Sequence, residues 1–304
     1  MLKAGIIGLG DIALKAYLPV LANKPNIEFH LCSRNESKLN EAGEKFRIVN
    51  RHTTLESLIN AGIKAAFVHA ATDAHFEIVN ELLLNGIHVY VDKPITMEYR
   101  LSKELVDLAE GKGLLLVVGF NRRFAPVYRQ LKEMEEPSVI IMQKNRKSLP
   151  DSIRRFVVED FIHVVDTLRF LFPYTIDQVL VHGKKRGNML HHLVVQFVSK
   201  KGPVAIGIMD RDTGTTEEKI EVMNASEKRT VYNVADLYIE KERQVIKTGT
   251  SDWEPTLYKR GFEGMLDDFI AALTTNSQPM ISKRDALLTH EICEYIVKRV
   301  EELE

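Results

Sequence analysis

The chain has 304 residues, enough for two domains of ordinary size. Hydrophobic residues make up 45% of it and charged residues 27%, which is typical of a globular protein and excludes a disordered or fibrous one. The 41 basic and 42 acidic residues leave a formal net charge of −1, so no overall positive field favours nucleic acid or an acidic membrane surface.

Short apolar runs alternate with amphipathic stretches from Lys3 to about Phe120. Strands are predicted over 4–7, 27–31, 65–69, 88–91 and 114–118, with helices between them, notably over 74–84 and 98–109. Continuous apolar strands separated by helices are typical of a parallel sheet covered on both faces. Residues 1–120 are therefore predicted to form a doubly wound α/β domain.

The pattern changes after Asn121. Helices are predicted around 125–135 and 159–172, and strands over 139–144, 178–182, 190–198, 204–209, 219–224, 229–234 and 244–247. From 178 onward the strands are separated by turn residues without helices, so we expect a largely antiparallel sheet. Two closing helices are predicted over 264–273 and 284–301. Residues 121–304 are therefore expected to form a second α/β domain.

A glycine-rich segment follows the first predicted strand and opens the first helical stretch. Residues 8–13 read Gly-Leu-Gly-Asp-Ile-Ala, the G-x-G-x-x-A form of the dinucleotide-binding fingerprint. Gly8 permits the tight turn, Gly10 lets the backbone approach a pyrophosphate, and Ala13 allows the helix to pack closely on the strand. We expect the pyrophosphate at the helix N-terminus, where free N–H groups, such as those of Asp11 and Ile12, favour an anion.

The end of the second predicted strand bears on which dinucleotide binds. For NAD, an acid is expected about 20 residues after the glycines, because it binds the ribose 2′-hydroxyl. Ser33 and Arg34 stand at that point instead, with Lys38 one helical turn later. A guanidinium binds a 2′-phosphate through charge-assisted, bidentate hydrogen bonds. The sequence therefore favours NADP, while NAD, with a solvated loop at these positions, remains the alternative.

Further motifs occur in order along the chain. They read Thr-Asp-Ala-His at 72–75, Asn-Gly-Ile-His-Val-Tyr-Val-Asp-Lys-Pro at 85–94, Val-Gly-Phe-Asn-Arg-Arg-Phe at 118–124, and His163-x-x-Asp166. With segment 8–13 they cover essentially the whole chain, which resembles the glucose-fructose oxidoreductase / inositol dehydrogenase / rhizopine-catabolism (Gfo/Idh/MocA) family. The likeness is closest to the MviM-like subgroup.

The resemblance implies a Rossmann domain in residues 1–120 and a substrate domain in residues 121–304. The open sheet of the second domain commonly makes oligomer contacts in this family, so a homodimer or homotetramer is expected. The last helix is free to pack back on the first domain. The resemblance further implies NAD(P)-linked chemistry on sugars, inositols or related small molecules.

The resemblance also carries over individual residues. The family's Glu-Lys-Pro appears here at 92–94 as Asp-Lys-Pro, so its lysine maps onto Lys93, and its usual histidine maps onto His163. Lys93, at the ligand-binding end of a parallel strand, could stabilise an alkoxide or pass a proton. His163 is the natural general base for a hydroxyl proton. Further cofactor contacts are expected from Ala71, Thr72, His75, Lys93 and Arg122. Without the family pattern, Lys93 would be interpreted as a surface lysine and His163 as a core histidine.

The chain departs from the family at the acid that precedes this histidine. Many members place an aspartate four residues before it, with a glycine between them. Here Glu159 is four residues before His163, Asp160 is three before it, and Ile162 occupies the glycine position. Both acids lie within one helical turn of the histidine, so either could be its partner.

These features predict an oxidoreductase that transfers a hydride between a nicotinamide cofactor and a sugar, polyol or related hydroxy or carbonyl compound. Two alternatives remain. One is a regulatory protein that senses NAD(P) without catalysis, which the altered acid pattern at Glu159 and Asp160 keeps open. The other is an NAD-dependent glycosidase on the same scaffold.

The remaining residues indicate neither a metal site nor a nucleic-acid or membrane partner. His191 and His192 alternate faces of a strand and lack a third ligand with metal spacing, so no metal site is expected. Cys32 and Cys293 lie in apolar patterns and are interpreted as buried hydrophobic residues. No apolar stretch reaches the ~18–20 residues of a membrane span, and the N-terminus has no signal-peptide core. We therefore expect a cytoplasmic enzyme whose partner is a small-molecule substrate.

Overall fold

The computed structural model describes residues 1–249, 251 and 253–303. By its internal contacts the chain divides into two compact units. Unit 1 comprises Met1–Gly119 together with Phe262–Leu288, and unit 2 comprises Phe120–Gly261 together with the residues from Thr289 onward. No helix in the described ranges is long and apolar enough to cross a membrane.

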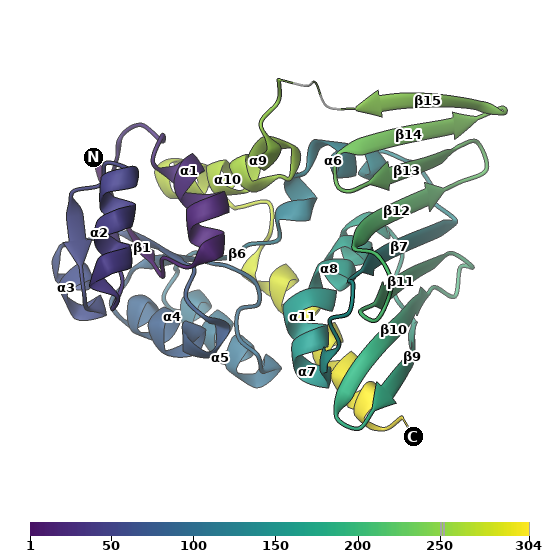
Figure 1. The fold of residues 1–304 in the computed structure, drawn as a ribbon, viewed down its shortest axis with the longest axis horizontal. Helices are drawn as coiled ribbons and strands as arrows, with labels where there is room; N and C mark the ends of the chain where they lie inside the picture. Colours follow the sequence, from purple (N-terminus) through teal and green to yellow (C-terminus); the bar gives the residue numbers. More distant parts are fainter. Residues whose placement is uncertain (250, 252, 304) are drawn as a thin grey trace. The chain divides into compact units, whose positions relative to one another are not determined.

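Unit 1 is built around a six-stranded, all-parallel sheet (Figure 1). Its strands are β1 (Leu2–Ile7), β2 (Ile27–Cys32), β3 (Asn50–His52), β4 (Ala65–Val68), β5 (His88–Val91) and β6 (Leu116–Val118). The strand order is β3-β2-β1-β4-β5-β6, so the direction in which successive strands are added to the sheet reverses between β1 and β4. This confirms the predicted doubly wound fold. Strand β3 was not predicted, because its three polar residues form no apolar run.

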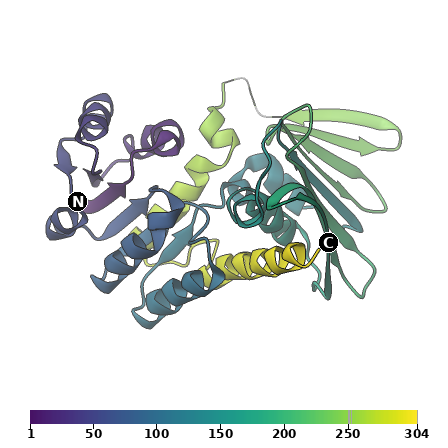
Figure 2. The ribbon, with the colours of Figure 1, turned by 60° about the horizontal axis from the view of Figure 1, so that its bottom comes forward.

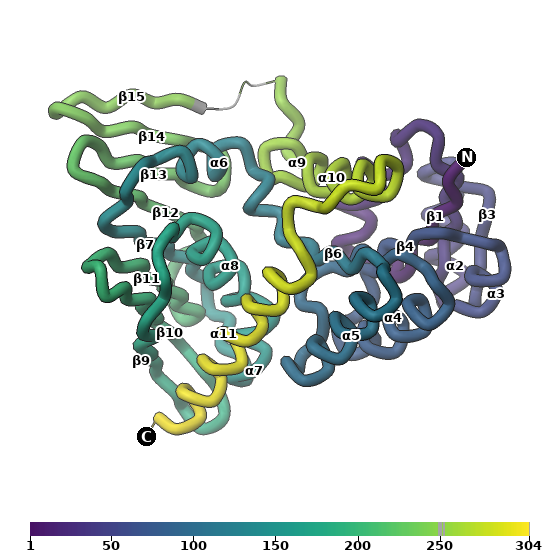
Figure 3. Tube along the Cα trace, turned by 180° about the vertical axis from the view of Figure 1, so that it is seen from behind, coloured from purple at the N-terminus to yellow at the C-terminus, as the bar shows by residue number. Residues whose placement is uncertain are grey.

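Helices cover both faces of this sheet. They are α1 (Leu18–Leu21), α2 (Glu36–Lys45), α3 (Leu55–Asn60), α4 (His75–Leu84), α5 (Tyr99–Gly111) and α10 (Phe262–Thr275). A short π-helix, η1 (Ala13–Tyr17), precedes α1, and a 3₁₀ helix, η2 (Thr72–Ala74), precedes α4. Helices α1 and α10 lie on one face, and α4 and α5 lie side by side on the other (Figures 1 and 3). Helix α10 is held by Phe269, whose ring packs edge-on against Phe67 of β4 at 5.4 Å between centroids.

Unit 2 contains a nine-stranded sheet. Its strands are β7 (Val139–Asn145), β8 (Asp151–Ser152), β9 (Gln178–Arg186), β10 (Met189–Val198), β11 (Val204–Asp210), β12 (Glu217–Met223), β13 (Lys228–Tyr232), β14 (Asp236–Lys241) and β15 (Gln244–Gly249). The path runs β15-β14-β13-β12-β7-β11-β10-β8, and β9 pairs with β10. Only the described pair β7–β11 is parallel, so the predicted largely antiparallel sheet is confirmed.

The helices of unit 2 lie on one face of this sheet (Figure 2). They are η3 (Asn121–Phe124), α6 (Pro126–Lys132), α7 (Ile153–Arg155), the π-helix η4 (Phe156–Phe161), α8 (Ile162–Leu171) and the part of α11 (Lys283–Glu301) that follows Leu288. Unit 2 also contains the short helix α9 (Thr256–Lys259). Alternation along β7 turns Ile140, Met142 and Lys144 toward the buried side. A lysine thus occupies a core position beneath the helices.

Candidate active site

The glycine loop after β1 has the geometry that a dinucleotide requires. Gly8 has φ +88°, and a Cβ added there would lie 2.5 Å from the backbone nitrogen of Ala70. Only glycine fits this left-handed position against a neighbouring backbone. A Cβ at Gly10 would meet no atom within 4 Å, so the backbone at Gly10 is open to an approaching group.

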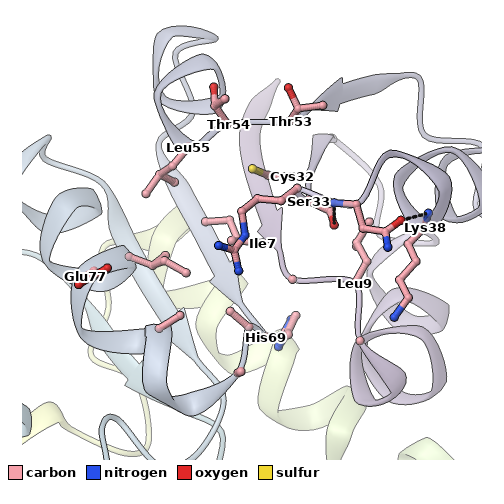
Figure 4. A pocket seen from close by; sticks show the side chains of 18 of the residues that line it. Ile7, Leu9, Cys32, Ser33, Lys38, Thr53, Thr54, Leu55, His69 and Glu77 are labelled. Carbon is pink, nitrogen blue, oxygen red and sulfur yellow. Dashed lines mark hydrogen bonds between the residues drawn. The ribbon is translucent and has the colours of Figure 1, made fainter.

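This loop opens on a pocket of about 850 Å³ at the carboxyl ends of β1, β2 and β4 (Figure 4). Of the expected cofactor-binding residues, those that line it are Gly8, Gly10, Ser33, Arg34, Lys38 and Ala71. The expected residues outside its lining are Asp11, Ile12, Ala13, Thr72, His75, Lys93 and Arg122. The lining also includes residues that the sequence analysis did not assign to the cofactor, among them Cys32, Thr53, Thr54 and His69. Thr53 and Thr54 escaped notice because they follow the unpredicted strand β3.

The end of β2 presents cations to this pocket. The Asn35 side chain caps α2 by accepting a hydrogen bond from the backbone of Lys38 at 3.0 Å. Arg34 and Lys38 are exposed, and neither side chain forms an ion pair within the described ranges. Cys32 is buried, and burial raises the pKa of its thiol to about 11. The thiol therefore stays protonated, and the free positive charges of this region remain available to an anion.

His75 joins two loops of unit 1. Its Nδ1 lies 2.9 Å from the carbonyl oxygen of Pro94, and its Nε2 lies 3.0 Å from that of Ala70. Its side chain is 1% exposed. His75 therefore ties the loop after β4 to the loop that carries Lys93, which is a positioning contact.

Asp92, the residue before Lys93, anchors the backbone of Lys93. Its Oδ1 accepts hydrogen bonds from the Tyr17 hydroxyl and from the Lys93 backbone N–H, both at 2.9 Å. Burial, and after it the charge of Asp92, raises the pKa of Tyr17 well above its ordinary value, so this hydroxyl remains a donor. A Cβ at Gly119 would lie 2.7 Å from the Tyr90 hydroxyl and 3.0 Å from Asp92. Asp92, which occupies the position of the family's glutamate, therefore lies in a closely packed cluster with Tyr17, Tyr90 and Gly119.

In unit 2, Arg122 links Glu218 to His163. Its Nε and one terminal nitrogen donate to the Glu218 carboxylate at 2.7 and 2.6 Å. Its other terminal nitrogen lies 2.7 Å from Nδ1 of His163. The Tyr128 hydroxyl also donates to Glu218, at 2.8 Å. Burial alone would raise the pKa of Glu218, but the Arg122 guanidinium overcomes it and holds that pKa at about 2.

The contact with Arg122 selects the protonation form of His163. A guanidinium only donates hydrogen bonds, so Nδ1 of His163 must accept. The proton of the neutral ring then resides on Nε2. A ring in this state presents an N–H donor through Nε2, whereas the expected general base requires a lone pair on that atom.

Asp160 is bound to two cations. Its carboxylate contacts Nζ of Lys144 and accepts from Nε of Arg146 at 3.2 Å. Lys144 is 3% exposed and lies directly across from Glu218 in the pairing of β7 with β12. Burial opposes ionisation of Asp160, but Lys144 and Arg146 lower its pKa well below the ordinary range. The hydrogen bonds of Asp160 therefore go to these cations, and none goes to His163.

Replacing Glu218 by glutamine is expected to destabilise the protein by about 3 kcal/mol at pH 7. The substitution leaves the buried Arg122 without its counter-charge, which typically costs ~3–5 kcal/mol. The pKa of Glu218 is lower in the folded protein than its ordinary value of 4.5. The stability that its ionised form contributes is therefore complete above pH 4.5 and is lost as the pH falls toward 2.

Urea unfolding at pH 7 and at pH 3 checks this expectation. The difference between the parent and Glu218→Gln should shrink at pH 3, because the Glu218 carboxyl is then protonated in the unfolded parent and must lose its proton on folding. Glu302→Gln, which removes an exposed partner of Arg299, should change the free energy of unfolding by less than about 1 kcal/mol. A Glu218 variant as stable as the parent at pH 7 would contradict the prediction.

Both units match models of known protein families. The Gfo/Idh/MocA model, described as an oxidoreductase family with an NAD-binding Rossmann fold, matches residues 2–120. A second model, described as a YceM-like C-terminal domain, matches residues 126–242. The two matches together cover most of the chain.

Individual relatives extend over both units. YceM of Salmonella typhimurium, named as an oxidoreductase, is 33% identical over 306 residues, covering 96% of this chain and 96% of that protein. The myo-inositol 2-dehydrogenase of Thermotoga maritima is 23% identical over 262 residues, covering 77% of this chain and 76% of its own length. The crystal structure of the dehydrogenase MviM from Clostridium difficile is similar with a TM-score of 0.92 at 30% identity, covering 98% of this chain and 99% of that one.

Proposed function

Because the chain belongs to the Gfo/Idh/MocA family of oxidoreductases, we propose that it transfers a hydride between a nicotinamide dinucleotide and a sugar, polyol or related small hydroxy or carbonyl compound. The observation that carries this proposal is the pocket onto which Gly8 and Gly10 open, with Lys93 following β5 of the same sheet. The name of the myo-inositol 2-dehydrogenase relative supports a polyol as one substrate class.

The cofactor we propose is NADP. Arg34 and Lys38 line the pocket, are exposed, and have no carboxylate partner in the described part of the chain. Ser33 stands where a carboxylate would repel a 2′-phosphate. A guanidinium with free donors supplies the charge-assisted contacts that a phosphate requires.

Arg34→Ala is expected to weaken NADPH binding roughly ten- to a hundred-fold while NADH binding changes little. The loss corresponds to one hydrogen-bonded charge contact, about 1.5–3 kcal/mol. Calorimetric titration with each cofactor measures the two effects. Equal losses for both cofactors, or tighter binding of NADH than of NADPH by the parent protein, would overturn the assignment.

In the proposed mechanism Lys93 handles the proton of the reacting oxygen. Bound nicotinamide supplies the hydride, and the protein supplies orientation and proton transfer. The backbone of Lys93 is held by Asp92, and the next peptide, through the Pro94 carbonyl, is held by His75. These contacts fix the backbone from which the Lys93 side chain extends, so its ammonium group is attached to a rigid strand end.

His163 is proposed to orient the substrate through Nε2–H. Arg122 occupies Nδ1, and the bidentate pair with Glu218 holds Arg122 in place. The ring can then donate to a substrate oxygen without changing its charge. Ring ¹⁵N shifts that show the proton on Nδ1 instead of Nε2 would contradict this role.

A screen of sugars and polyols, followed at the absorbance of NADPH, tests the proposed function. Turnover with a change in cofactor redox state supports the dehydrogenase. Release of a glycan without net cofactor change would indicate a glycosidase that uses the cofactor transiently.

One observation favours a second candidate, a regulatory protein that binds the dinucleotide without catalysis. Asp160 is committed to Lys144 and Arg146, so it supplies no carboxylate to His163. If NADPH binds tightly and no compound is turned over, this second function replaces the first.

A further inference from the structure

His69 is a buried side chain whose two ring nitrogens are unpaired within the part of the chain that the structure describes. It directly follows β4 and is 4% exposed. Neither Nδ1 nor Nε2 has a hydrogen-bond partner among the residues that the structure describes. Buried polar atoms in native proteins are nearly always hydrogen-bonded, because an unpaired one loses its hydration without compensation. The ring therefore points to a partner from outside the chain.

The surroundings of the His69 ring indicate that its hydrogen-bond partner lies in the pocket. One face stacks on the Tyr17 ring, with 3.8 Å between centroids and 23° between planes. The Tyr17 hydroxyl is already bonded to Asp92 and to Tyr90. His69 lines the pocket described above, and Figure 4 shows it at the end away from Thr53 and Thr54. A group inside the pocket is thus the partner within reach.

The ring is uncharged at neutral pH. Burial, and after it the charge of His75, lowers the pKa of His69 to about 3. A neutral imidazole offers one N–H donor and one acceptor nitrogen. A single hydroxyl group can satisfy either atom, whereas a phosphate only accepts and suits an imidazolium better.

Sheet order indicates which half of a dinucleotide reaches His69. Strands β2, β1 and β4 are neighbours. Gly8 and His69 directly follow β1 and β4, and Arg34 comes two residues after β2. Dinucleotides bind across the crevice where the strand order reverses, with the pyrophosphate at the loop after the first strand. With the 2′-phosphate at Arg34 and the pyrophosphate at the glycine loop, the nicotinamide half extends over β4.

We propose that His69 is a cofactor-binding residue that forms a hydrogen bond with a hydroxyl of the nicotinamide ribose. This inference rests on the proposed function, because it requires the dinucleotide in the pocket. It adds to the glycine loop and Arg34 a third contact, one that recognises the redox half of the cofactor.

The variant His69→Phe keeps the stack on Tyr17 and removes both nitrogens. We expect its affinity for NADPH to fall roughly three- to ten-fold, the usual effect of one neutral hydrogen bond. The melting temperature of the cofactor-free protein should not fall, because two unpaired buried nitrogens are replaced by carbon. His182→Phe, on an exposed position of β9, is the matched control and should change neither quantity.

Adenosine 2′,5′-bisphosphate separates this inference from the proposed function. The compound holds only the adenosine half, so the parent and His69→Phe should bind it equally. If His69→Phe weakens this fragment as much as NADPH, or binds NADPH like the parent, the inference is wrong although the protein remains a dinucleotide-binding one. A parent that binds neither compound overturns the proposed function and this inference with it.

The protonation of the ring gives a second readout. In protein with ¹⁵N-labelled histidine, the His69 ring should stay neutral between pH 6 and 8 with and without NADPH. An imidazolium spectrum in the complex would identify a phosphate as the partner and overturn the hydroxyl assignment.

Discussion

Lys93→Met is expected to lower turnover by about 10²–10⁴-fold once a substrate is identified. A positioned acid–base group typically contributes this much, and methionine keeps the length of the side chain while removing its charge. NADPH affinity should change little, because Lys93 is not among the residues that line the dinucleotide pocket. Steady-state kinetics and calorimetric titration of the same preparation measure the two effects.

The control for this variant is Lys103→Met. Lys103 lies on the surface of α5, where it pairs with Asp107 one helical turn away, so its loss should leave turnover unchanged. A Lys93→Met protein with parental activity would eliminate Lys93 as the proton-handling group. It would leave the NADP assignment intact, since that depends on Arg34.

Gly10→Val is expected to abolish detectable binding of NADPH and NADH while leaving the fold intact. A Cβ added at Gly10 meets no protein atom within 4 Å, so the valine side chain has open space at its base, but it occupies the path by which a pyrophosphate approaches. Calorimetry measures the loss, and thermal unfolding shows that the variant is folded.

Two other glycines sharpen this test. Gly111 also has open space at its Cβ position but lies at the end of α5, outside the pocket, so Gly111→Val should bind cofactor normally. Gly8→Ala should instead destabilise the loop, because its Cβ would collide with the backbone of Ala70. Parental NADPH affinity in folded Gly10→Val would rule out this loop as the pyrophosphate site.

Local sequence pattern was sufficient to predict most of the strands and the glycine loop. Apolar runs predicted five of the six parallel strands, and the glycine segment was recognisable because a tight turn between a strand and a helix needs small residues at set spacings. Ser33 and Arg34 were identifiable for the same reason, since they directly follow β2. Strands β3, β8 and β14 were missed, because their short, polar or mixed sequences carry little apolar signal.

The polar contacts, by contrast, were decided by tertiary structure. Arg122 meets Glu218 across 96 positions of sequence, and the register of β7 with β12 then sets Lys144 opposite that glutamate. No local periodicity encodes such a pairing.

The sequence by itself determined the doubly wound fold, the glycine loop and the cations after β2, because each depends on neighbours within a few residues. Only the tertiary structure decided that Asp160 binds Lys144 and Arg146 and that His163 accepts a hydrogen bond from Arg122. It also decided that the His69 ring has no hydrogen-bond partner among the described residues. Hydrogen bonds depend on distances and directions between atoms that the chain brings together only when its sheets are assembled.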